Sequence, residues 1–129
     1  MTNSQVLLYN FTIDDRAAKL GRWLTREKIR VRVVQAPEFL HPLGFLFEIP
    51  GFQPNPQFNL GGNFQDEMIV LKDFSDAQLN SFLRFFRDNR LAPIELKAVL
   101  TPVTQYWNSL ELHKELTREH KAMKENKKS

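Results

Sequence analysis

The chain contains no cysteine. This absence excludes a disulfide scaffold, a thiolate zinc site, an iron–sulfur centre and a cysteine nucleophile, and it fits a reducing compartment. Long apolar runs are also missing, since none approaches the roughly 18–20 residues that span a bilayer. The first residues, 1–5, carry no basic region of the kind that begins a signal peptide. We therefore expect a cytoplasmic protein with no membrane partner.

Glycine and histidine are scarce, and the motifs built on them are absent. The five glycines form no Gly-x-Gly-x-x-Gly and no P-loop, and there is no Gly-x-Ser-x-Gly. The three histidines are His41, His113 and His120, and no two have the i, i+4 spacing of a helical metal site. We expect no cofactor and no metal. The sequence favours a role other than catalysis without deciding the question.

The net charge is small and unevenly distributed. The chain has 18 Lys and Arg against 15 Asp and Glu, a formal net charge of +3. Residues 114–129 contain six of the basic and three of the acidic side chains, so the rest of the chain is neutral overall. A basic stripe also follows one predicted helix at Arg16, Lys19, Arg22 and Arg26. Because the aromatic motifs of RNA-recognition sheets are missing, a solvated helix face explains this stripe better, and nucleic acid is an unlikely partner.

With 129 residues the chain is long enough for one domain with its own core, and we expect a single domain over residues 1–129. The first half predicts a strand at Gln5–Phe11, which is apolar on both faces. A helix then begins at Asp14 or Asp15 and buries a stripe of leucines. Residues Ile29–Val34 alternate between apolar and basic side chains, which indicates a half-solvated edge strand.

The second half repeats this plan. Glu67–Lys72 predicts a strand that is apolar on both faces and therefore central. Ser75 caps the next helix, in which apolar residues recur at helical spacing: Leu79, Phe82, Leu83 and Phe86. Residues 94–100 alternate as an edge strand does. Asn108 then caps a final helix that ends in a basic tail, over residues 108–129.

The predicted element order is therefore βαβ, a long connection, βαβ and a last helix. It indicates an α/β protein, an α+β sandwich whose four-stranded sheet has strands one and three at its centre. The favoured arrangement is ferredoxin-like, with strand order 4-1-3-2. The alternative is a doubly wound parallel sheet of order 2-1-3-4, because the connection between strands two and three is long enough for a crossover.

The connection, residues 36–65, is rich in proline, glycine and phenylalanine. Low-complexity disorder rarely contains so many aromatic side chains, so we expect a folded flap over the sheet or an interface. In the alternative interpretation, these rings complete the core of the domain. The candidates for a homodimer interface are Phe45, Phe52 and Phe58 in the connection, with Leu116 and Met123 on the final helix.

The junction between the fourth strand and the last helix is the candidate ligand site, because α/β proteins commonly hold ligands where a strand end meets a helix start. Thr101, Thr104 and Asn108 lie in this turn, Lys97 lies in the strand before it, and His41 lies in the flap. With the free N–H groups of the helix, these side chains suit a small anionic ligand. The alternative is that Asn108 only caps the helix, as any such helix requires.

Residues 66–121 combine an apolar strand followed by Asp73-Phe74-Ser75, the segment Lys97–Pro102, Trp107 and Glu119-His120. In this combination they resemble a bacterial family of uncharacterised small domains, domain of unknown function 3783. The family pattern has asparagine where this chain has Thr104. The resemblance implies a small α/β domain of bacterial origin, and it implies no activity, cofactor or partner.

Three functions are compatible with the sequence. The leading interpretation is a non-catalytic binding or regulatory domain that self-associates, acting through the flap and the turn before the last helix. The second is an enzyme of unrecognised type that acts on a small anionic substrate. The third is a weak nucleic-acid binder that uses the basic face of the first helix.

Overall fold

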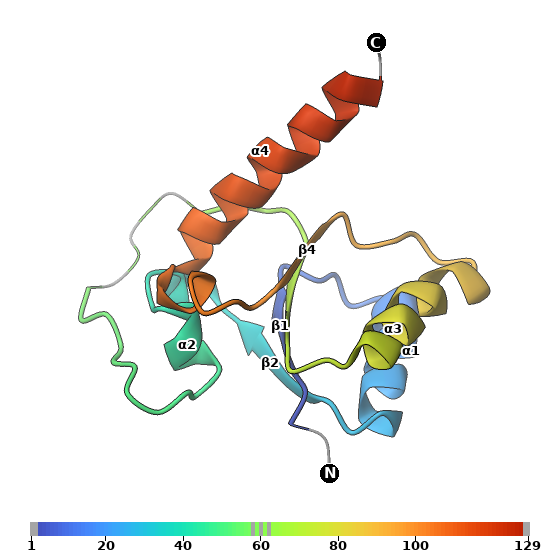
Figure 1. Cartoon of the computed structure of the whole chain (residues 1–129), viewed down its shortest axis with the longest axis horizontal. Helices are drawn as coiled ribbons and strands as arrows, with labels where there is room; N and C mark the ends of the chain where they lie inside the picture. Colours follow the sequence, from blue (N-terminus) through green and yellow to red (C-terminus); the bar gives the residue numbers. More distant parts are fainter. Residues whose placement is uncertain (1–2, 58, 60, 62, 128–129) are drawn as a thin grey trace.

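The computed structural model describes residues 3–57, 59, 61 and 63–127, and for residues 124–127 it describes the backbone alone. Within this part of the chain, one four-stranded sheet has the order β2-β1-β3-β4 (Figure 1). Its strands are β1 (Gln5–Tyr9), β2 (Arg30–Val34), β3 (Met68–Lys72) and β4 (Leu96–Val99). Strands one and three are therefore central, as predicted.

The sheet is mixed, because two parallel βαβ units meet through an antiparallel pair. β1 is parallel to β2 and β3 is parallel to β4, whereas β1 and β3 are antiparallel. The predicted fold class, an α/β sandwich, is confirmed, but the ferredoxin-like strand order 4-1-3-2 is wrong. The observed strand order is that of the alternative, 2-1-3-4. It differs from the doubly wound sheet in that the two central strands, β1 and β3, are antiparallel. Burial patterns report which strands are central, but a connection of this length leaves the direction of the next strand open.

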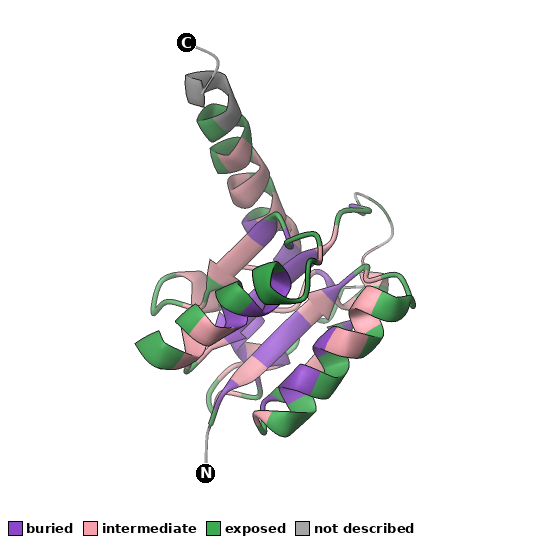
Figure 2. Ribbon diagram, turned by 90° about the vertical axis from the view of Figure 1, so that its right-hand side faces the viewer, coloured by how far each residue is buried: buried purple, intermediate pink, exposed green. Residues whose placement is uncertain are grey.

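Helices α1 (Asp15–Arg26) and α3 (Asp76–Asp88) cover one face of the sheet. Both begin where the sequence predicts, since Asp14 accepts a hydrogen bond from the amide of Ala17 and Ser75 accepts one from the amide of Gln78. In Figure 2 their inner sides are buried and their outer sides are exposed. The buried layer under them is aromatic and aliphatic: Val6, Leu20, Trp23, Leu24, Ile69, Leu71, Phe82, Phe85 and Phe86.

The connection and the start of α4 (Ser109–Lys127) cover the opposite face. The connection contains a 3-10 turn, η1 (Ala36–Glu38), and a single-turn helix, α2 (Leu43–Leu46). Phe39, Phe47 and Phe64 are buried here and complete the core, whereas Phe45 and Phe52 are only partly covered. The connection is thus a folded flap whose buried rings also complete the core, so both interpretations of its phenylalanines apply. Phe58 lies outside the described residues.

The edge strand β2 is half-solvated, as predicted, but both of its faces are partly exposed, the apolar one included. Val31 is 46% exposed and Val33 is 56% exposed, at the margin of the face that α1 and α3 cover. Arg30 and Arg32 point to the other face, where the connection supplies partners for their charges. The alternation of the sequence fixes which side chains share a face, and the tertiary structure decides how far each face is covered.

The last helix extends beyond the domain. Leu112 is buried and Leu116 packs on the same core, but the following turns run away from the body of the protein (Figures 1 and 2). Met123 is exposed near the far end. Among the described residues, no helix combines the length and apolar character that a membrane crossing needs.

Candidate binding surface at the junction of the connection and α4

The turn between β4 and α4 is closed by two threonines. The amide of Thr101 donates to Oγ1 of Thr104 at 2.9 Å, and the amide of Thr104 donates to Oγ1 of Thr101 at 3.0 Å. The two hydroxyl oxygens lie 3.1 Å apart. A 3-10 turn, η2 (Thr104–Tyr106), follows directly. These hydroxyls therefore stabilise the turn, and their first partners are each other.

Asn108 caps α4, as predicted, and forms a capping box with Glu111. The side chain of Asn108 accepts from the amide of Glu111 at 2.8 Å, and the Glu111 carboxylate accepts from the amide of Asn108 at 3.0 Å. Trp107, one residue earlier, packs against the core cluster that contains Leu112. The two residues hold the positions of a hydrophobic staple. The amide side chain of Asn108 is thus used by the helix itself.

The flap folds back onto this junction, as the sequence predicts. The amide of Leu43 donates to the carbonyl of Trp107 at 2.8 Å, and the amide of Ser109 donates to the carbonyl of Phe39 at 3.1 Å. An isolated antiparallel bridge also joins Pro42 to Asn108. Backbone hydrogen bonds at both ends of a short segment fix its position, so the flap and the start of α4 form one surface.

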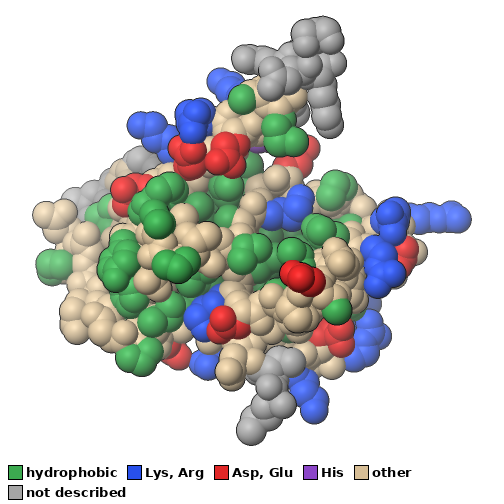
Figure 3. Space-filling view, viewed as in Figure 1, with side chains coloured by type: hydrophobic (Ala, Val, Ile, Leu, Met, Phe, Trp, Pro, Cys, Tyr) green, Lys and Arg blue, Asp and Glu red, His purple; other side chains and the backbone are tan. Residues whose placement is uncertain are grey.

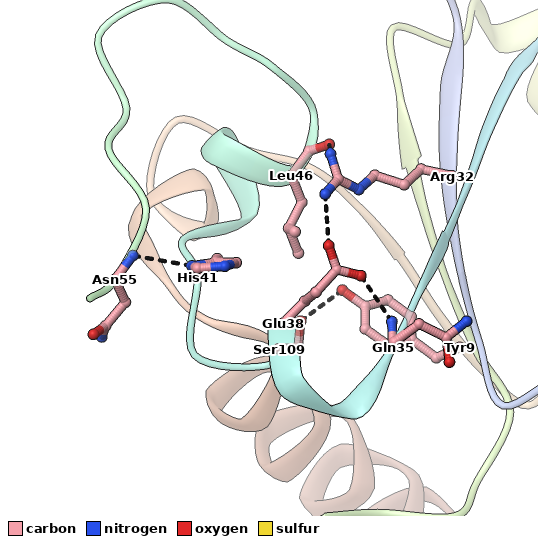
Figure 4. Close-up of polar contacts among 8 residues, drawn as sticks. All are labelled: Tyr9, Arg32, Gln35, Glu38, His41, Leu46, Asn55 and Ser109. Atoms are coloured by element: carbon pink, nitrogen blue, oxygen red, sulfur yellow. Dashed lines mark hydrogen bonds and ion pairs between the residues drawn. The ribbon is translucent and has the colours of Figure 1, made fainter. Parts of the chain in front are cut away.

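Buried and half-buried polar contacts tie the flap and α4 to the sheet (Figure 4). The Tyr9 hydroxyl lies 2.7 Å from Oγ of Ser109, and both residues are buried. Burial raises the pKa of Tyr9 further than the hydrogen bond to Ser109 lowers it, so the phenol stays protonated at neutral pH. This contact joins the end of β1 to the first turn of α4.

A second polar contact fixes η1. Glu38 accepts from Nη2 of Arg32 at 2.6 Å and from the backbone amide of Gln35 at 3.0 Å. Partial burial acts to raise the pKa of Glu38, but the amide of Gln35 and the guanidinium of Arg32 outweigh it and hold this pKa below its ordinary value. Arg32 also reaches the carbonyl of Leu46, so one arginine contacts both helical turns of the flap.

We expect Glu38→Gln to lower the free energy of unfolding by up to about 1 kcal/mol at pH 7. Because the pKa of Glu38 is lowered in the folded protein, its contribution is present above the ordinary pKa of 4.5 and is lost as the pH falls through the folded value. Urea unfolding between pH 7 and pH 3 measures this difference. The two proteins should converge at acid pH, and a constant difference would contradict the assignment.

The predicted ligand-binding side chains do not converge on one point. Lys97 lies on the face of β4 that α1 and α3 cover, because it pairs with Ile69 of β3. Its ammonium donates to the carbonyl of Ile94 at 2.7 Å. Nδ1 of His41 accepts from the amide of Asn55 at 2.9 Å (Figure 4). The His41 ring also packs edge-on against the ring of Phe45. A cavity of about 330 Å³ lies between the flap and α4 and is lined in part by Asn108. Binding of a small anion there stays a prediction.

An uncharged apolar patch forms where the flap meets η2. The ring of Phe52 lies 5.1 Å from that of Tyr106. Val103 directly precedes η2, and its carbonyl accepts a hydrogen bond from the amide of Tyr106. Tyr106 is 69% exposed and Val103 is 65% exposed. Phe52, Val103 and Tyr106 are here called the flap patch. In Figure 3, hydrophobic side chains gather on the side where Figure 1 shows α2 and η2.

The other predicted interface residues have different surroundings. Phe45 and Leu116 pack against the core and are only partly accessible. Met123 is exposed on the projecting part of α4. Of the five, Phe52 alone belongs to the flap patch, and Phe58 lies outside the described residues. Val103 and Tyr106 were missed by the sequence reasoning, although they stand in an uncharged segment, residues 98–110, that also contains the predicted turn.

The predicted basic stripe on α1 is incomplete, because Arg16 turns inward. Its Nη1 atom contacts both carboxylate oxygens of Glu67 at 2.8 and 2.9 Å, and its Nε donates to the carbonyl of Ala92. Lys19 forms an ion pair with Asp15. Arg22 and Arg26 remain exposed. The structure therefore brings fewer free cations to this face than the periodicity predicts.

A second cavity, of about 430 Å³, lies beside the middle of α4. Nε2 of His113 is 2.8 Å from a carboxylate oxygen of Asp66, and Nε2 of His120 is 3.3 Å from one of Glu95. The seven-residue spacing places the two histidines on one helix face, and their carboxylate partners could not be read from the sequence. Within the described ranges, no three His, Asp or Glu side chains are grouped as metal ligands.

The comparisons with known proteins concern the C-terminal part of the chain. Neither the comparison with curated proteins nor the one with solved structures gives a match. One family model matches residues 67–123, a segment that runs from the residue before β3 into α4. This part of the chain is similar to a domain of unknown function (DUF3783), an uncharacterised domain family.

Proposed function

We propose that the protein is a non-catalytic cytoplasmic binding domain that self-associates through the flap patch. The supporting observation is the exposure of two apolar side chains, Tyr106 and Val103, next to a third, Phe52, that comes from a distant part of the chain. Aromatic side chains are enriched at the centres of protein interfaces, and exposed apolar clusters commonly mark interaction sites. The hydroxyl of Tyr106 adds a polar group that can remain solvated at the rim of the interface.

The charge distribution around the patch favours a second copy as the partner. The flap from residue 49 to residue 65 contains no charged side chain, and neither does the segment from residue 98 to residue 110. Two identical surfaces that face each other across a twofold axis bring each side chain near its own copy. An uncharged surface can pair with its own copy without like-charge repulsion and without burying an unpaired charge in the interface.

The patch is also held in place before it meets a partner. Gly44 is buried under the ring of Phe52, and a Cβ atom at this position would come within 2.6 Å of that ring. The backbone bridges from the flap to Trp107 and Ser109 fix the other side of the surface. A preorganised surface loses little conformational entropy on association. This supports a binding function for the flap patch, whereas the polar groups predicted to bind a small anion are used by internal contacts.

The experiment is a mass measurement by sedimentation equilibrium over a wide range of concentration. We expect the wild-type chain to self-associate, and Tyr106→Glu to weaken association at least tenfold because a charge would be buried against its own copy. Val103→Glu should act in the same direction.

Ile13→Glu is the matched control, since Ile13 is a fully exposed apolar residue outside the flap patch. It should associate as the wild type does. A wild type that stays monomeric at every concentration would contradict the proposal. So would equal weakening by Ile13→Glu, which would indicate a general effect of added negative charge.

A further inference from the structure

We infer that the 430 Å³ cavity beside α4 binds a free α-amino acid with an apolar side chain. Its walls come from four segments: the first turn of α1, residues 66–67 before β3, residues 92–96 leading into β4, and residues 117–121 of α4. None of the three flap-patch residues lines it, so this site does not depend on the proposed self-association. The inference is carried by the hydrogen-bonding capacity that the cavity walls leave unused.

Cationic donors remain available in the cavity. Arg16 uses Nη1 and Nε for Glu67 and Ala92, and its Nη2 atom has no hydrogen bond within the described part of the chain. These contacts hold the guanidinium in a fixed orientation between the rings of Phe11 and Phe86, 5.9 Å from each. Lys121, on the wall formed by α4, has no ion pair among the described residues. A fixed guanidinium and an unpaired ammonium suit a carboxylate.

Anionic acceptors remain available beside them. Glu95 and Asp66 each use one carboxylate oxygen, toward His120 and His113 respectively, and their side chains are largely exposed. Their second oxygens have no partner within the described residues. Nε2 of His120 is itself buried and, despite its 3.3 Å approach to Glu95, lacks a hydrogen bond of good geometry in the described structure. Carboxylate oxygens with free acceptor capacity suit an ammonium group.

The presence of both charge types selects the class of ligand. A simple anion would meet the carboxylates of Asp66, Glu67 and Glu95, and a simple cation would meet Arg16 and Lys121. A zwitterionic α-amino acid can contact both sets at once, because its carboxylate and ammonium groups are bonded to the same carbon atom. Leu96 and the turn at Ala92 and Pro93 add an apolar wall for the side chain. The volume is within the range of small-molecule sites, roughly 300–1,000 Å³.

The test compares L-leucine with two blocked derivatives by isothermal titration and thermal unfolding of the full chain. L-leucine at about ten times its dissociation constant should raise Tm by about 4 °C. N-acetyl-leucine, which lacks the ammonium, and leucinamide, which lacks the carboxylate, should each bind at least tenfold more weakly. Equal binding of either derivative would overturn the inference in favour of a simple anion or cation site. No response to L-leucine, glycine or L-phenylalanine would also overturn it.

Two variants and a control localise the binding. Lys121→Met and Glu95→Gln should each weaken L-leucine binding at least tenfold, and both positions are exposed enough for the variants to fold. Lys114→Met is the control, since Lys114 is exposed on the same helix and does not line the cavity. Unchanged binding in both cavity variants, or equal loss in Lys114→Met, would overturn the site. Self-association measured in parallel should be the same for all three variants.

Discussion

Replacing Phe39 by alanine is expected to lower the free energy of unfolding by about 3–5 kcal/mol. The side chain is buried, its ring stacks on that of Phe64 at a centroid distance of 4.7 Å, and it lies 5.7 Å from the ring of Tyr9. Removing it leaves a cavity at the point where the flap packs on the sheet, and the surrounding rings can relax only in part. Equilibrium unfolding in urea, monitored by tryptophan fluorescence, measures the loss.

Leu83→Ala provides the comparison for this prediction. Leu83 lies on α3 and is exposed, so its truncation should cost no more than about 0.5 kcal/mol. A Phe39→Ala variant that loses no more than Leu83→Ala would show that the flap does not contribute to the core. The same variant should also weaken self-association, because Phe39 anchors the flap that supplies Phe52.

The second large effect concerns the buried contact between Tyr9 and Ser109. Tyr9→Phe keeps the ring but leaves the Ser109 hydroxyl buried without its partner, and Ser109→Ala leaves the phenol in the same condition. We expect each single substitution to lower the free energy of unfolding by about 2 kcal/mol, the cost of an unsatisfied buried polar group. The double variant should lose clearly less than the sum of the two, because it leaves no orphaned hydroxyl.

Urea unfolding of the four proteins in this cycle gives the coupling energy directly. A coupling energy of about 1 kcal/mol or more would confirm that the two hydroxyls stabilise each other. Strict additivity of the two losses would mean that the contact between β1 and α4 contributes nothing to stability. Thr117→Ala is a useful control on α4, since this residue is half-buried and, among the described residues, its hydroxyl forms a hydrogen bond only with His113, one helical turn away.

Local features of the fold were predictable from the sequence. Asp14, Ser75 and Asn108 cap helices where their spacing predicts, because a cap is a contact between residues three positions apart and depends on nothing else. Apolar runs likewise identified β1 and β3 as central strands. The direction of β3 relative to β1 was not predictable, because it depends on how the connection packs after leaving β2.

The candidate sites show the same division. His41, Lys97 and Thr101 were predicted to share one ligand site, but in the structure the polar groups of each contact residues of their own segment. The flap patch joins Phe52 to Tyr106, which are 54 positions apart in the sequence. The cavity beside α4 draws on four separate segments, and its arginine was predicted to lie on a solvated stripe instead.

The sequence by itself determined which segments are helices and strands, which strands are buried on both sides, and that the Phe-rich connection is folded. These properties depend on hydrophobic periodicity and on contacts within one helical turn, and both are set by residues that are close together in the sequence. Only the tertiary structure decided the antiparallel centre of the sheet, the partial exposure of the apolar face of β2 and the inward orientation of Arg16. Each of these depends on which distant segment supplies burial or an opposite charge, and no local pattern carries that information.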